Sequence, residues 1–96
     1  MSERELYIKK FEAKIDEWKA EAQALRARTE GASADAQLQA KRELDGVERQ
    51  IDDAEKRLDE LREAGDDAWT SIKDGADAAW SSLSEGFSKA ADRLKG

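Results

Sequence analysis

Carboxylates are the most abundant side chains with chemistry to offer, and metal binding is the first chemistry to consider. Acids lie side by side at Asp52-Asp53 and Asp66-Asp67. A row of acids at helical spacing runs through Glu48, Asp52, Glu55 and Asp59. A carboxylate metal centre in a helical bundle requires inward-facing Glu with a His three residues later. The chain has no His and these acids fall outside the apolar positions, so we expect solvated carboxylates and no metal or other cofactor.

Hydroxyl groups are the second candidate chemistry, because serines gather in the last third of the chain. They are Ser71, Ser81, Ser82, Ser84 and Ser88. A serine nucleophile needs a neighbouring base, which is most often His, and the chain has neither His nor Cys. A helical chain of this length rarely encloses a ligand pocket. We therefore expect no enzymatic activity and no small-molecule substrate.

Tryptophan is the residue type that provides the functional candidates. The chain has three Trp residues, although aromatic residues make up only 6% of it. Trp favours protein interfaces and lipid surfaces, because its ring is apolar and its N–H is polar. An aromatic stripe at helical spacing is, however, more typical of a core. The candidate anchors, for a partner or for the core of a bundle, are Trp18, Trp69, Ile72, Trp80, Leu83 and Phe87.

The elements that must position these residues are amphipathic helices. In the first third, apolar residues alternate at spacings of three and four: Ile8, Phe11, Ile15, Trp18, Ala22, Leu25 and Thr29. The middle third repeats this pattern at Leu44, Val47, Ile51, Ala54, Leu58 and Leu61. Such heptads are typical of left-handed coiled coils. Between Ala36 and Leu44 the spacing becomes four and four through Ala40, which is a stutter that locally unwinds the supercoil.

The last third follows an 11-residue repeat. Its apolar positions are Trp69, Ile72, Ala76, Trp80, Leu83, Phe87, Ala91 and Leu94, spaced 3, 4, 4, 3, 4, 4 and 3. Eleven residues make almost three helical turns, so this stripe stays on one face with a slight right-handed drift. Gly75 and Gly86 occupy equivalent places in the first two copies, where they would let another helix approach closely. The third copy has Ala91 where the others have Trp.

Two glycine-containing stretches are candidate turns. Gly31 can end a helix and Ser33 can cap the next, while Gly65 can end a helix and Asp66 can serve as the following N-cap. Cutting at both predicts helices over about 3–30, 34–63 and 67–95, whose similar lengths suit an antiparallel three-helix bundle.

Two other arrangements stay open at this point, since one interior Gly costs a helix only about 1 kcal/mol. One is a long helix that passes through Gly31 and folds back once, and the other is a nearly continuous helix that assembles with other chains. We expect an all-α protein, a coiled-coil hairpin or three-helix bundle. It divides into a heptad segment, 1–64, in which a break falls near 31–33 in one arrangement, and an amphipathic helix, 65–96, with the 11-residue repeat.

Charge narrows the classes of partner. Charged residues make up 42% of the 96 residues, and the net charge is -6. Acids and bases are interleaved, so nothing provides the basic face that nucleic acid requires, and no nucleic-acid partner is expected. Residues 65–96 hold six acids and four bases, which does not favour attraction to anionic lipid. The chain has no long apolar run, and its N-terminus is not a secretory signal, so we expect a cytoplasmic protein.

Several short motifs resemble those of small bacterial coiled-coil stress-response proteins. They are Arg4-Glu5-Leu6-Tyr7-Ile8-Lys9-Lys10, Asp16-Glu17-Trp18, Gly65-Asp66-Asp67-Ala68-Trp69, Gly75 and Ala79-Trp80. The resemblance implies a stress-linked, non-enzymatic role, and this family offers no active-site residues to carry over. The expected function is therefore a stress-associated interaction or scaffolding role, with a protein partner or self-association. The alternative is a peripheral, membrane-protective protein that acts through the C-terminal helix.

Overall fold

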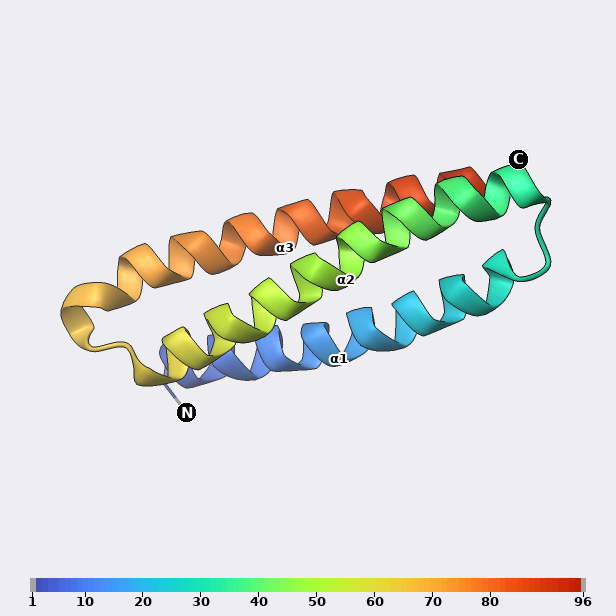
Figure 1. Ribbon diagram of the computed structural model, residues 1–96. Coiled ribbons are helices and arrows are strands. Elements are labelled where there is room, and N and C mark those ends of the chain that lie inside the picture. The colour runs from blue at the N-terminus through green and yellow to red at the C-terminus, as the bar shows by residue number, and fades with distance from the viewer. Residues whose placement is uncertain (1, 96) are drawn as a thin grey trace.

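The computed structural model describes the backbone of residues 2–95 and the side chains of residues 2–92, and it consists of three α-helices (Figure 1). They are α1 (Glu3–Thr29), α2 (Ala34–Glu63) and α3 (Asp66–Lys95). Successive helices run in opposite directions and form a rod with extents of 50 × 21 × 16 Å. The expected all-α fold is confirmed, and of the three arrangements left open by the sequence the chain adopts the three-helix bundle.

The turn between α1 and α2 lies at residues 30–33 and is closed by local hydrogen bonds. Thr29 ends α1, and its hydroxyl donates to the carbonyl of Leu25 at 2.8 Å. The Ser33 side chain accepts a hydrogen bond from the amide of Ala36, so Ser33 is the N-cap of α2, as predicted. Gly31 keeps a negative φ, so it does not end α1 through the left-handed conformation that Gly usually supplies.

The turn between α2 and α3 is only two residues long. Ala64 follows α2 in an extended conformation, with φ -63° and ψ 130°. The carbonyl of Gly65 accepts hydrogen bonds from the amides of Ala68 and Trp69, at 3.1 and 3.0 Å. The prediction that Asp66 caps this helix is wrong, because Asp66 is itself the first helical residue and its carboxylate pairs with Arg4.

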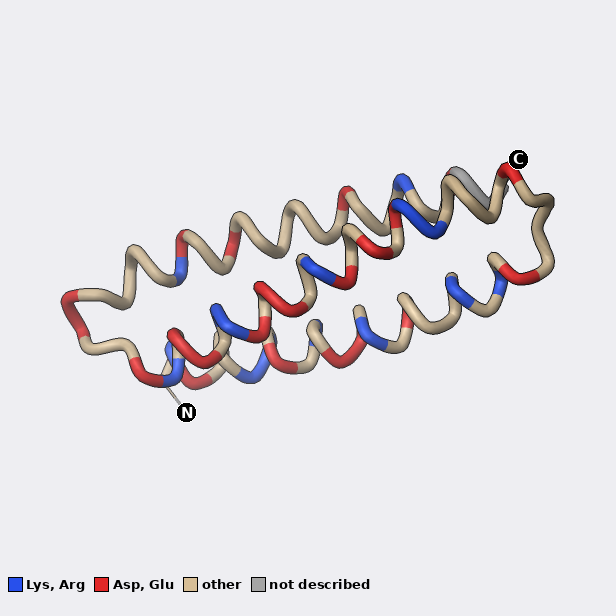
Figure 2. Tube along the Cα trace, in the orientation of Figure 1, with Lys and Arg blue, Asp and Glu red and all other residues tan. Residues whose placement is uncertain are grey.

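The core lies along the centre of the rod, where the three predicted apolar stripes meet. α2 packs closely against both of its neighbours, whereas the backbones of α1 and α3 lie farther apart. The buried apolar residues are Phe11, Ile15, Trp18, Ala22, Leu25, Ala40, Leu44, Val47, Ile51, Ala54, Leu58, Leu61, Ala76, Leu83, Phe87 and Ala90. Ala40, at the predicted stutter, is among them, so the stripe of α2 continues through it. No acidic or basic residue is buried among the described side chains. Acids and bases are spread along all three helices (Figure 2).

Candidate functional site

All six candidate anchors turn toward the interior of the bundle. Trp18, Leu83 and Phe87 belong to the buried core, with 1%, 0% and 5% of their surfaces exposed. Trp69, Ile72 and Trp80 are half-buried and pack against that core. The structure therefore brings the six candidates together within one chain. They contribute to the core of the bundle and do not project outward as anchors for a partner.

An aromatic row fills the space between α1 and α3. It consists of Tyr7, Phe11 and Trp18 from α1 with Trp69 and Trp80 from α3. The ring centroids of Trp18 and Trp80 lie 5.4 Å apart and nearly perpendicular, and those of Phe11 and Trp80 lie 6.1 Å apart. Tyr7 meets Trp69 edge-on at 5.9 Å. These distances are typical of favourable aromatic pairs, so large rings bridge the wider gap between the two helices.

Cationic side chains cover the aromatic row. The guanidinium of Arg4 lies 4.4 Å from the centre of the Trp69 ring. The ammonium of Lys14 lies 5.7 Å from both Trp18 and Trp80. Lys10 also lies over Trp80, at 5.3 Å. A cation over a ring is worth about 0.5–1 kcal/mol at an exposed site, so the half-buried rings of Trp69 and Trp80 already have cationic partners.

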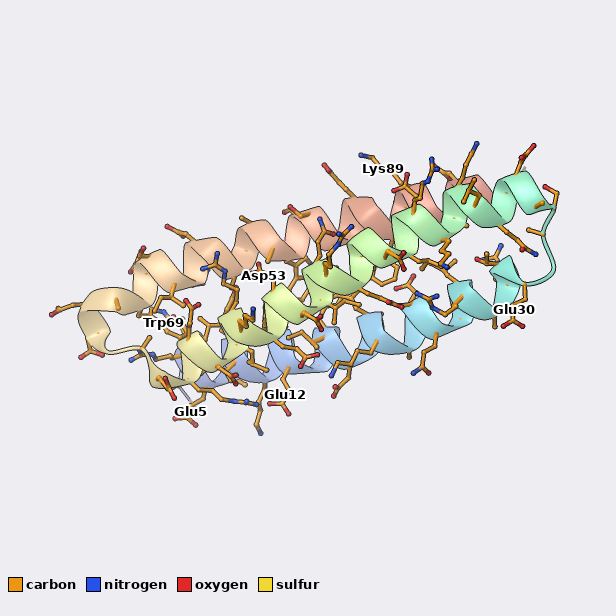
Figure 3. All side chains as sticks on the ribbon, in the orientation of Figure 1. Glu5, Glu12, Glu30, Asp53, Trp69 and Lys89 are labelled. Atoms are coloured by element: carbon orange, nitrogen blue, oxygen red, sulfur yellow. The ribbon has the colours of Figure 1, made fainter. Side chains whose placement is uncertain are left out.

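Arg4 joins the start of α1 to the turn between α2 and α3. Its guanidinium donates to the backbone carbonyl of Ala64, and to that of Gly65 at 3.4 Å. It also pairs with the carboxylate of Asp66 at 3.1 Å. Together with the position of Arg4 over the Trp69 ring, these contacts hold the turn against α1. We call this set of contacts the Arg4 clasp. Trp69 is labelled near this end of the bundle in Figure 3.

A second polar link between α1 and α3 involves Tyr7, Lys73 and Asp77. The Tyr7 hydroxyl donates to Asp77 at 2.6 Å, and Lys73 donates to the other carboxylate oxygen at 3.0 Å. Burial and the hydrogen bond to Asp77 raise the pKa of Tyr7 well above its ordinary value. The same hydrogen bond, with that from Lys73, lowers the pKa of Asp77. The pair is therefore stable as a phenol and a carboxylate near neutral pH.

The opposite side of α3 faces α2 through its glycines. A Cβ atom placed on Gly86 would lie 3.0 Å from Val47 Cγ2 and 3.2 Å from Gln50 Oε1, which is tighter than most Cβ contacts and would require these neighbours to shift by a few tenths of an ångström. A Cβ on Gly75 would lie 3.5 Å from the guanidinium of Arg57, which is an ordinary contact. The predicted close approach is confirmed at Gly86, while the space at Gly75 is less restrictive.

Ion pairs link α1 to α2 along the outside of the bundle. Lys19 pairs with Glu55 at 2.8 Å, and Arg26 pairs with Glu48 at 2.7 Å. Hydrogen bonding to these two carboxylates raises the pKa of Lys19 and that of Arg26. Because both cations are exposed, such pairs contribute little to stability and mainly favour one alignment of the helices.

Open grooves lie between the helices. One of them, about 290 Å³, lies between α1 and α2 at Ala22 and Ile51. Another, of about 270 Å³, is lined by Trp18, Phe87 and Ala91, where the third copy of the repeat lacks a Trp to fill the space. Within residues 2–92, no group of three acidic, His or Cys side chains is placed to hold a metal ion.

Three residues with the most specific polar contacts were not among the sequence candidates: Arg4, Tyr7 and Asp77. The available signals were weak. Lys73 and Asp77 are four residues apart, which suits a pair on one helix, and Arg4 and Tyr7 are three apart on one face. Neither spacing says which residue of another helix lies opposite.

No helix in the described residues is both long enough and apolar enough to cross a bilayer. Comparisons with known proteins add no further identification: no family model, no curated protein and no solved structure matches this chain.

Proposed function

We propose that this chain is a non-catalytic coiled-coil protein that binds another protein or acts as a scaffold in a stress-associated process. The observation that carries the proposal is the mutual burial of all three apolar stripes, with the tryptophans among them. The chain therefore presents to its surroundings a charged rod about 50 Å long. A rod of this kind is suited to holding partners at a fixed distance or to offering them a helical face.

Two outer surfaces of the rod differ in charge and provide places for probes. The second half of α2 is densely charged: it exposes Asp52, Asp53, Asp59, Glu60 and Glu63, with the bases Arg49, Lys56 and Arg62 among them. The middle of α3, residues 78–84, is uncharged and exposes only the small residues Ala78, Ser81, Ser82 and Ser84. A protein partner would meet very different chemistry on these two surfaces, so its contacts should fall mainly on one of them.

The link to stress is supported by the resemblance of the short motifs that surround Arg4, Trp18 and Trp69. The proposal includes a cytoplasmic location and assigns no cofactor. It predicts that contacts with a partner increase when cells experience heat, salt or oxidative stress.

The alternative is a membrane-protective role for α3 at a lipid surface. Its support is the uncharged middle of that helix, residues 78–84. Two observations favour the protein-interaction role instead: Trp69 and Trp80 pack against the core, and acids outnumber bases in residues 65–96. A lipid-binding helix usually carries its aromatic side chains outward and an excess of bases.

In-cell photo-crosslinking tests the two roles together. A photoreactive residue is placed at Ser81 on α3 or at Asp52 on α2, and crosslinked products are compared before and after stress. A discrete protein product that forms from one surface and increases under stress is the expected result. Crosslinks to lipid from position 81, with flotation of the purified protein on liposomes at low salt, would instead establish the alternative. Absence of any stress-dependent product from either surface would contradict the proposed role.

A further inference from the structure

The two-residue turn between α2 and α3 contains nothing that prevents it from becoming helical. Neither Ala64 nor Gly65 has a positive φ, and the chain has no Pro. At the turn the backbone departs from helical geometry at Ala64, whose ψ is extended. Short hinges of this kind are the usual sites at which proteins exchange an element with a second copy.

The apolar stripe keeps its register across the turn. From Leu61 the next positions are Gly65 and Trp69, spaced four and four, after which the stripe of α3 continues through Ile72. The 11-residue spacing also joins the two helices, because Leu58 and Trp69 are eleven residues apart, as are Trp69 and Trp80. If residues 64 and 65 were helical, α2 and α3 would form one helix with a single uninterrupted apolar face.

One contact of the Arg4 clasp exists only when the turn is closed. Arg4 donates to the Ala64 carbonyl, which a continuous helix would use for its own hydrogen bond, whereas the Gly65 carbonyl already accepts from the amides of α3. The hydrogen bond to Ala64 therefore stabilises the folded-back form and is lost when the turn opens. The contacts of α3 with the core, in contrast, depend only on having an α1–α2 hairpin to pack against.

We propose that this protein forms a dimer by exchange of α3 between two copies of the chain. In each copy α2 and α3 join into one helix of about 60 residues, about 90 Å long at 1.5 Å per residue. The two long helices run antiparallel, so each α3 lies on the α2 of the other copy in its native direction. Each exchanged α3 makes the contacts with α1 and α2 that it makes within one chain, including that of Gly86 with Val47. The partner is a second copy of this chain, and the interaction needs no surface beyond the existing core.

An engineered disulfide reports which chain supplies α3. The chain has no Cys, and a Cβ at Gly86 lies 3.0 Å from Val47 Cγ2, close enough for a Val47→Cys/Gly86→Cys pair to bond. Oxidation closes the bond within one chain in the monomer and between two chains in the exchanged dimer. A non-reducing gel separates the two products. X-ray scattering of the protein without the added cysteines measures the maximum dimension independently, which should rise from about 50 Å toward 100 Å.

Two substitutions should favour exchange for different reasons. Arg4→Ala removes the hydrogen bond to the Ala64 carbonyl, and because both copies in a dimer lack this bond we expect the dissociation constant of the dimer to fall about a hundredfold. Gly65→Ala places a better helix former at a position where a Cβ meets nothing in the closed turn. It should favour the continuous helix about fivefold per chain.

Two controls should not promote exchange. Arg26→Ala removes the ion pairs with Glu48 and Asp45 but leaves the turn untouched. Insertion of three glycines between Ala64 and Gly65 keeps every core contact while breaking the continuous helix, and should hold the protein as a monomer.

The result expected is an interchain disulfide and an elongated dimer that increase in Arg4→Ala and Gly65→Ala and not in the controls. Dimers that retain the intrachain disulfide, or a dimer fraction that neither substitution raises, would overturn the proposal. The measurement uses purified protein alone. Its outcome is therefore independent of whether a different protein binds the rod, as proposed in the preceding section.

Discussion

The two sides of α3 pack against their neighbouring helices in opposite ways. Toward α2, the helix presents Gly86 and allows the backbones to come close enough for Val47 to touch the Gly86 position. Toward α1, it presents Trp69 and Trp80, whose rings fill a wider gap. The same 11-residue repeat supplies both sides, so one sequence pattern encodes a close contact and a distant one. The close contact with α2 forms because Gly86 has no side chain, and the distant contact with α1 forms because Trp69 and Trp80 have large ones.

Removal of the Trp80 ring, which contacts both Phe11 and Trp18, should have the largest effect. Trp80→Ala leaves a cavity beside Phe11 and Trp18, and we expect a loss of about 3 kcal/mol or more in the free energy of unfolding. Urea denaturation measures this loss, with Trp80→Phe as a control that should retain most of the stability. A loss below about 1 kcal/mol for Trp80→Ala would mean that rings do not hold α1 and α3 together.

The close contact should respond to a single added methyl group. Gly86→Ala places a Cβ against Val47 and Gln50 and should destabilise the bundle by about 1–3 kcal/mol. Gly75→Ala is the matched control, because its Cβ meets only the flexible end of Arg57, and Ala should stabilise the helix by up to about 1 kcal/mol. Thermal unfolding should show a lower melting temperature for Gly86→Ala and an equal or higher one for Gly75→Ala. Equal effects at the two glycines would remove the distinction between the two sides of α3.

The polar link between Tyr7 and Asp77 should give a smaller, pH-dependent contribution. The lowered pKa of Asp77 means that its contribution is present above the ordinary value of 3.8 and is lost as pH falls through the lowered pKa. The raised pKa of Tyr7 means that its contribution is present below the ordinary value of 10.0 and is lost as pH rises above it.

Tyr7→Phe should therefore lower the melting temperature by a few degrees between about pH 4 and pH 10, and by less outside that range. Melting curves of the two proteins across pH test this. A difference that is constant at every pH would indicate lost packing rather than a lost hydrogen bond.

Helix boundaries and core positions could be read from the sequence, because they depend on local spacing. The predicted helices differ from α1, α2 and α3 by no more than one residue at each end. α3 begins one residue earlier than predicted because the Gly65 carbonyl accepts its first hydrogen bonds. The pairing of the Asp66 carboxylate with Arg4, 62 residues away in sequence, leaves no local signal. Tyr7 and Asp77, which are 70 residues apart in sequence, were missed for the same reason. Periodicity shows which face of a helix is apolar, but it does not show which polar groups of two helices lie opposite one another.

The turn at residues 30–33 was one of three options, because Gly31 alone did not decide it. The hydrogen bonds that close it come from ordinary side chains, among them Gln37, which donates to the carbonyls of Glu30 and Ala32. The inward placement of Trp69 and Trp80 was likewise open. An amphipathic stripe predicts burial against something, and only the folded chain shows that this is α1.

α1 and α2 follow a seven-residue repeat and α3 follows an 11-residue repeat, and this difference limits how long the bundle can become. A stripe that repeats every seven residues drifts around its helix in one sense, by about 20° per repeat, and a stripe that repeats every eleven residues drifts in the opposite sense. Helices with such stripes stay in register over a few turns and then rotate out of contact. Further copies of the 11-residue unit added to α3 would therefore carry its tryptophans away from α1. Growth of such a protein by duplication would require the other two helices to change period as well.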